Sequence, residues 1–165
     1  MCEHRGLVSE WVVLLHVVIA FWFVAGMLGR NVTMAKARSA TDIGTLEELV
    51  DLSGRFERLM VIPGSFAVLV AGLLAAWSEG QPLAGTDDWW LFTSLILFVA
   101  VGLLVPTVFL PHGKVFEAAL EDAERRGEVT PELRTALRDP AVRNARALEL
   151  VTVAIIITLM VTKPF

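Results

Sequence analysis

The chemistry that this sequence could perform centres on one histidine in an almost wholly apolar stretch. His16 stands inside WVVLLHVVIAFWFVAGMLGR, which runs from Trp11 to Arg30. An ionisable side chain is unfavourable within a lipid bilayer, so its presence there is by default a hypothesis about function. Neutral imidazole is the commonest metal ligand in proteins, and histidine also often holds haem iron.

The residues leave three roles open for His16. Its imidazole could be structural, bonded to Ser65, to Ser94 or to a backbone carbonyl of another helix; it could ligate haem or another metal; or it could relay protons or contact a substrate. At about 100° per residue, the same helical face carries Val12, Ile19, Ala20, Phe23, Met27 and Arg30. This composition indicates an inward face, with the imidazole about 7–8 Å below the outer end of the helix.

A second metal ligand for such a site is hard to find in the sequence. His112 is expected at the opposite depth, and His4 lies in an amino-terminal tail. Met27 shares the face of His16 but lies about 16 Å along the helix. If haem binds, we therefore expect one axial ligand from this chain, or a second from a neighbouring copy. Motifs for phosphate loops, zinc proteases, serine hydrolases and dinucleotides are absent, so whether the protein is an enzyme stays open.

The elements that must position His16 are long apolar segments. The chain has 165 residues, of which 55% are hydrophobic and 19% are charged. A membrane-spanning helix needs roughly 20 apolar residues, and helices satisfy their own backbone groups within lipid. Four segments meet this requirement: 11–29, 59–77, 89–110 and 147–162. The sequence therefore predicts a single all-α domain over 1–165, built as a bundle of four transmembrane helices.

The distribution of basic residues predicts how the bundle is oriented. Five Lys and Arg residues follow the first segment and seven follow the third, which accounts for twelve of the fourteen in the chain. Because cytoplasmic connections carry the excess of Lys and Arg, both termini should lie outside and both long connections should lie in the cytoplasm. Trp11, Trp77, Trp89 and Trp90 fall at the outer ends, where indole rings favour the interface. No nucleic-acid partner is expected from this pattern.

Both cytoplasmic connections carry signals for helices. Thr45 followed by Glu48 matches a capping box and predicts a helix leading into the second span. In the second connection, Gly127 should end an extension of the third span. Capping side chains before proline, at Thr130 and Asp139, predict two further helix starts.

Within the spans, a few residues depart from a simple apolar helix. Pro63 and Pro106 each remove a backbone hydrogen bond and should distort their helices. Near the start of the fourth span, Glu149 follows Arg146 by three residues, which predicts an internal ion pair between them.

The first two spans also resemble a known group of proteins. LHVVIAFWFVAGML, with His16, Phe23 and Gly26, and RLMVIPGSFAVLVAGLLAAW are similar to segments of small four-helix bacterial membrane proteins. That group includes the copper-resistance D type, the J-type protoporphyrinogen oxidases and integral membrane relatives of unknown function, which the second segment resembles most. The likeness implies the four-helix fold and a haem or metal role for His16, beside Phe23 and Gly26. Phe23 replaces the group's usual tryptophan, and the basic residue of the oxidase branch has no clear match.

Two functions follow as expectations. The first is binding of haem b, or of a related hydrophobic or metal ligand, through His16 in the outer half of a bundle in the bacterial inner (cytoplasmic) membrane. The second is a non-enzymatic structural or accessory subunit of a larger membrane complex. Membrane lipid is the expected environment in either case, and a homo-oligomer is a further possibility.

Overall fold

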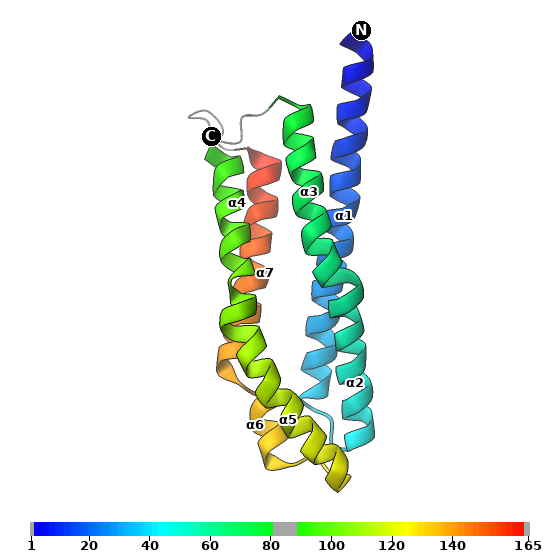
Figure 1. Cartoon of the computed structure of the whole chain (residues 1–165), viewed down its shortest axis with the longest axis vertical. Helices are drawn as coiled ribbons and strands as arrows, with labels where there is room; N and C mark the ends of the chain where they lie inside the picture. Colours follow the sequence, from blue (N-terminus) through cyan, green and yellow to red (C-terminus); the bar gives the residue numbers. More distant parts are fainter. Residues whose placement is uncertain (1, 81–88, 164–165) are drawn as a thin grey trace.

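The computed structural model describes residues 2–80 and 89–163, and it describes side chains from residue 9 onward (Figure 1). These residues form seven α-helices and two short π-helical segments. In chain order they are α1 (Cys2–Ala37), α2 (Ile43–Phe56), η1 (Glu57–Val61), α3 (Ile62–Ser78), α4 (Trp89–Gly102), η2 (Val105–Phe109), α5 (Leu110–Arg126), α6 (Pro131–Leu137) and α7 (Pro140–Thr162).

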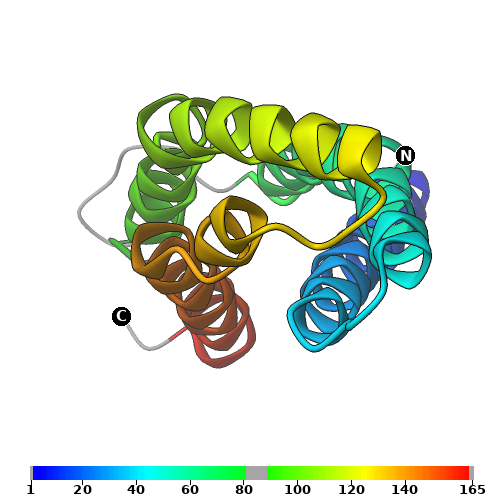
Figure 2. The same ribbon diagram turned by 90° about the horizontal axis from the view of Figure 1, so that it is seen from below.

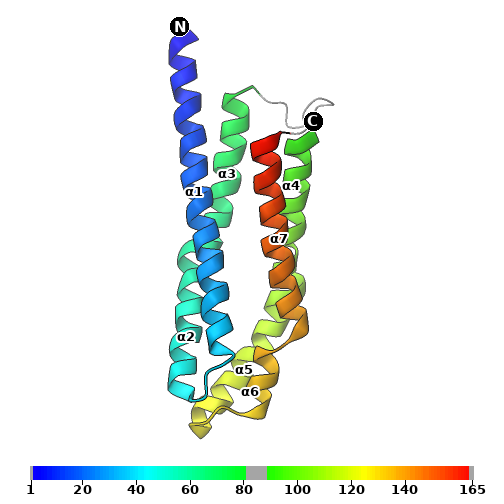
Figure 3. The ribbon, with the colours of Figure 1, turned by 180° about the vertical axis from the view of Figure 1, so that it is seen from behind.

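Four helical stretches of the described chain are long and apolar enough to cross a membrane. They are Ser9–Ala37, Ile43–Ser78, Trp89–Arg126 and Pro131–Thr162. The amino-terminal end of α1 and the carboxy-terminal end of α7 lie at the same end of the bundle (Figures 1 and 3). The predicted all-α bundle of four transmembrane helices is therefore confirmed.

The bundle is built from two helix pairs. α1 packs along α3 and its preceding turn η1, whereas α4 packs along α7. Glycines bring α1 and α3 together: a Cβ added at Gly64 would lie 3.1 Å from Cβ of Phe23, and one at Gly26 would lie 2.5 Å from Cβ of Met60. Small residues allow this close approach of helix backbones within a membrane.

A packed cap closes the other end of the bundle, where the sequence predicts the cytoplasm. Figure 2 looks at this end and shows α5 crossing from the α4–α7 pair towards α2. The buried core of the cap draws residues from the end of α1, from α2, α5 and α6, and from the connections: Ala37, Ala40, Leu46, Ala123, Leu133 and Leu137. The cap thus joins the two helix pairs at one end.

The predicted helix signals in the cap are mostly confirmed. α5 ends before Gly127, which has φ 70°. Thr130 accepts a hydrogen bond from the backbone N–H of Leu133, and Asp139 accepts one from that of Ala141. The start predicted at Thr45 is wrong, because α2 begins one turn earlier.

The true cap of α2 is Asp42. Its carboxylate accepts the backbone N–H of Thr45 over 2.8 Å, and this bond lowers the pKa of the carboxyl group. A charged acceptor satisfies the free N–H groups of the first turn and favours the positive end of the helix dipole.

Each of the two prolines is accommodated by a π-helical turn. Pro63 follows η1 within two residues, and Pro106 lies inside η2. A residue that lacks an N–H breaks the regular hydrogen-bond ladder, and a single π-helical turn absorbs the disruption without ending the helix.

The tryptophans at the outer ends do not all face the membrane interface as predicted. Trp11, Trp77 and Trp89 are exposed, but Trp90 is only 8% exposed. It packs with Ala76 and Leu91 inside the bundle, and Nζ of Lys163 lies 5.3 Å from its ring centroid. The prediction was wrong for Trp90 because adjacent positions on a helix point about 100° apart.

Candidate functional site

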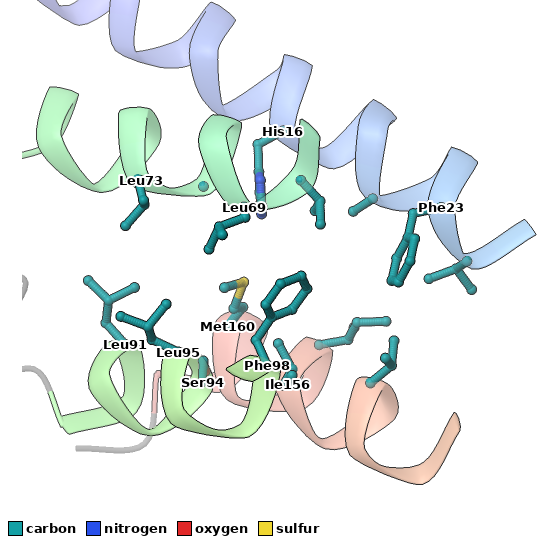
Figure 4. A pocket seen from close by; sticks show the side chains of 16 residues that line it. His16, Phe23, Leu69, Leu73, Leu91, Ser94, Leu95, Phe98, Ile156 and Met160 are labelled. Carbon is teal, nitrogen blue, oxygen red and sulfur yellow. The ribbon is translucent and has the colours of Figure 1, made fainter. Parts of the chain in front are cut away.

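An apolar cavity of about 100 Å³ separates the two helix pairs in the half of the bundle that carries the termini (Figure 4). All four long helices contribute to its walls. The lining includes His16, Ala20 and Phe23 of α1, Leu69, Gly72 and Leu73 of α3, Leu91, Ser94 and Phe98 of α4, and Ile156, Ile157 and Met160 of α7. Two of the lining residues, Leu73 and Ile157, are exposed.

His16 is the one ionisable side chain in the wall of this cavity. Its Nδ1 atom is buried and finds no hydrogen-bond partner among the described residues. The backbone carbonyl of Val68 on α3 lies within interaction range of the imidazole. A buried polar atom without a partner is unfavourable, and such atoms often mark a place where a ligand or water completes the bonding.

Gly72 makes room for the imidazole. A Cβ added at Gly72 would lie 3.0 Å from Cε1 and 3.3 Å from Nδ1 of His16. Any larger residue at position 72 of α3 would therefore push the imidazole ring of His16 away from its present position. The absence of a side chain at Gly72 lets the imidazole lie close to α3 while α1 and α3 stay closely packed.

The two serines considered as structural partners of His16 donate elsewhere. Ser94 is buried and donates to the carbonyl of Trp90 over 2.8 Å, and Ser65 donates to the carbonyl of Ile62 over 2.7 Å. Each hydroxyl thus bonds within its own helix. Neither serine therefore bonds to the imidazole of His16.

The structure separates the other two residues of the first-helix motif. Phe23 lines the cavity with His16 and is 6% exposed. Gly26 is buried against Met60 and lies outside the cavity wall. Met27, on the same face, is fully buried in a cluster with Phe23 and Val61. Spacing along the helix correctly identified this inward face.

Met160 is the candidate that sequence reasoning missed. It reaches the cavity from α7, on the side opposite the helix that carries His16 (Figure 4). A signal was available, because His16 lies near the start of the first span and Met160 near the end of the fourth. With both termini at one end of the bundle, the two positions fall at similar depths.

The remaining histidines do not join the cavity. The side chain of His4 lies outside the described residues. His112, on α5, lies at the cap, where its Nδ1 is 2.5 Å from Oδ2 of Asp139. This contact ties α5 to the N-cap residue of α7, and His112 is not among the residues that line the cavity.

A second site, which is polar, lies between the cavity and the cap. Arg30 on α1 is 5% exposed, and its Nη1 lies 2.5 Å from Oε2 of Glu57 in η1. Its Nη2 bonds to Glu149 of α7, and its guanidinium carbon lies 5.8 Å from the ring centroid of Phe109. The predicted pair between Arg146 and Glu149 is wrong, since the carboxylate turns across the bundle to Arg30.

Polar groups elsewhere in the described chain do not form a metal cluster. No group of three or more His, Cys, Asp or Glu side chains in the described part of the chain could hold a metal ion. A metal at His16 would therefore have to arrive with ligands of its own, as iron does in a tetrapyrrole.

Comparison with known proteins identifies a family. A family model described as "Predicted integral membrane protein (DUF2269)" matches residues 10–164 of the chain. No curated protein and no solved structure matches the chain.

Proposed function

The chain belongs to this family of integral membrane proteins, and we propose that it binds a hydrophobic ligand in the cavity through His16. Haem b is the ligand that we propose in particular. The observation that carries the proposal is the imidazole of His16, which is the one ionisable group in the wall of an apolar cavity and whose buried Nδ1 has no partner among the described residues. A ligand that bonds to the imidazole would relieve this unfavourable burial.

The side chains of the cavity suit a tetrapyrrole. Histidine and methionine are both axial ligands of haem iron, and His16 and Met160 enter the cavity from opposite walls (Figure 4). Aliphatic and aromatic side chains supply the apolar surface that a macrocycle requires.

The size of the cavity sets a condition on binding. Pockets for ligands of drug size usually measure about 300–1,000 Å³, which is several times the present volume. The two helix pairs must therefore move apart to admit a whole tetrapyrrole. The arrangement favours such a movement, because each helix packs mainly within its own pair in this half of the bundle.

The carboxylates of haem would need polar or charged contacts at the edge of the cavity. The cavity wall itself carries no charged side chain. Lys163, one turn after Met160, lies at the same end of the bundle, 3.9 Å from Oε2 of Glu79. Lys163 could leave Glu79 and pair with a haem carboxylate instead. The carboxylate would then lie at the aqueous end of the site, where little solvation is lost on forming an ion pair.

The division of roles follows from these positions. When bound, haem would supply one-electron redox chemistry. His16 and Met160 would hold the ligand, and the leucine and phenylalanine side chains would exclude water. The likeness of the first helix to the copper-resistance D type and J-type oxidase groups supports this role. It also supports a setting of the chain in the bacterial inner membrane.

A visible spectrum tests the proposal. Protein purified in mild detergent, with and without added haem b, should show a Soret band that shifts on reduction. His16→Ala should lose or strongly weaken this band, and His112→Ala should retain it because His112 lies at the cap. A wild-type preparation that is colourless as purified, and that retains no added haem after gel filtration, would refute haem binding and favour the accessory-subunit alternative.

A further inference from the structure

The polar site between the cavity and the cap has an imbalance of charge. Two carboxylates, those of Glu57 and Glu149, both bond to Arg30. Arg146, one turn before Glu149 on α7, lies close enough to both carboxylates and to Arg30 and Arg38 for electrostatic interaction. Three arginines thus face two carboxylates, which leaves one positive charge in excess.

Arg146 is a cation of this site that, among the described residues, lacks hydrogen-bond partners for two of its nitrogens. Its Nε and Nη1 atoms are buried and have no hydrogen-bond partner within residues 9–80 and 89–163. Burial of a charge that is neither paired nor hydrogen-bonded is strongly unfavourable, and protein arginines do not lose their proton to escape it. The unpartnered nitrogens of Arg146 are therefore suited to an anion.

Arg38 adds a second cation beside Arg146. It follows the last turn of α1, where its Nε donates to the backbone carbonyl of Leu137 over 3.1 Å. No carboxylate pairs with it in the described part of the chain. The two guanidinium groups therefore come from opposite helix pairs, at the level where the bundle meets the cap.

We infer that Arg146, assisted by Arg38, binds a phosphate group. The planar fork of a guanidinium group matches two phosphate oxygens, which makes arginine the preferred residue for such anions. Basic sites between transmembrane helices on the cytoplasmic side are suited to anionic lipid headgroups, and the charge pattern of this chain predicts that side. Arg146 is partly exposed, so the site is open to the surface.

The bound phosphate group could belong to an anionic phospholipid or be free phosphate. In either case the site would join α1 to α7 through a bound anion, below a cavity that lies between those helices. The inference does not depend on haem binding, because none of these arginines lines the cavity.

Thermal unfolding of delipidated protein in detergent tests the inference. The probes are phosphatidylglycerol, zwitterionic phosphatidylcholine as a control lipid, and inorganic phosphate. Phosphatidylglycerol, phosphate or both should raise the unfolding temperature of the wild type, and phosphatidylcholine should have little effect. A response to phosphatidylglycerol alone identifies a headgroup, and a response to phosphate alone identifies the soluble anion.

Arg146→Gln should lower the affinity for the anion that stabilises the wild type at least about tenfold, because two charge-assisted hydrogen bonds are lost. Without any anion, the same variant should unfold at a higher temperature than the wild type, since an unpaired buried charge is removed. Arg143→Gln is the matched control, because Arg143 is exposed on the same helix.

Arg146→Lys provides a second variant, which keeps the charge but not the fork and should bind with intermediate affinity. The inference is wrong if neither anion stabilises the wild type, or if both Arg146 variants respond as the wild type does.

Discussion

At the scale of single residues, a buried arginine connects three parts of the chain. Arg30 of α1 bonds to Glu57 of η1 and to Glu149 of α7, so one guanidinium group links the two helix pairs. Ion pairs of this kind contribute little net stability relative to apolar packing, but the loss of one partner leaves the other charge buried alone. The two carboxylates differ in this respect, because the Glu149 side chain is 8% exposed and that of Glu57 is 35% exposed.

Removal of these carboxylates should therefore have unequal effects. We expect Glu149→Ala to lower the free energy of unfolding by about 3–5 kcal/mol, as is typical when a buried pair loses one partner. Glu57→Ala should lower it by clearly less, since water can reach this side of Arg30. Denaturant titration in detergent micelles, followed by circular dichroism, measures both values. Equal losses, or a larger loss for Glu57→Ala, would show that burial does not determine the contribution of each carboxylate.

The sequence predicts the inward residues better than it predicts their partners. Helical periodicity correctly predicted that His16, Phe23 and Arg30 point into the bundle, because the residues that share a face of one helix follow from their spacing alone. It could not show that Glu149 would bond to Arg30, since that contact depends on how two distant helices pack. The position of Met160 along its span matched it in depth to His16, but which side of α7 faces the cavity depends on the same packing.

At the scale of the elements, glycines determine how closely α1 and α3 approach. The contacts repeat along both helices, with Gly26 opposite Met60, Gly64 opposite Phe23 and Gly72 beside His16. The glycine that approaches its neighbour most closely is Gly26, which positions α1 against η1. The same packing holds His16 at the cavity.

A methyl group at Gly26 should separate these elements. In Gly26→Ala the new Cβ would lie 2.5 Å from Cβ of Met60, which is too close to tolerate without movement of the backbone. We expect the free energy of unfolding to fall by about 1–3 kcal/mol, the usual effect of overpacking. Thermal unfolding in micelles should show the loss. Gly102→Ala is the control, because a Cβ there meets nothing within 4 Å, and an equal effect in both variants would contradict this account of Gly26.

The long elements were predictable and their details less so. Runs of about 20 apolar residues have few alternatives to a membrane helix, so the four spans could be identified from hydropathy alone. The capping box of Thr45 and Glu48 predicts the start of α2 at Thr45, whereas in the structure the backbone N–H of Thr45 donates to the carboxylate of Asp42, which is the true cap. The π-helical turns depend on hydrogen bonds around Pro63 and Pro106 that proline alone does not specify.

At the scale of the whole molecule, two helix pairs are joined at the cap and separated by a cavity at the other end. The fold places both termini at the open end (Figure 3). The basic residues predict that this end faces outward, because they concentrate at the cap. The cavity of His16 would then lie in the outer half of the membrane, and the phosphate site of Arg146 in the inner half.

Labelling of single cysteines tests this orientation. Cys2 is the one cysteine of the chain, and it lies at the end predicted to face outward. A membrane-impermeant maleimide should label it in intact cells. A cysteine placed at the cap by Glu128→Cys, in a Cys2→Ser background, should react only after the membrane is opened. The reverse pattern would show that the charge distribution was misread and that the bundle is inverted.

The claim that His16 anchors a ligand is tested most directly by chemical rescue. Haem b is titrated into wild type, His16→Ala and His112→Ala, and the axial ligation is followed by visible and electron paramagnetic resonance spectra. We predict a histidine-ligated signal in the wild type and in His112→Ala, its loss in His16→Ala, and its return when free imidazole is added to His16→Ala. An unchanged signal in His16→Ala without imidazole would contradict the account.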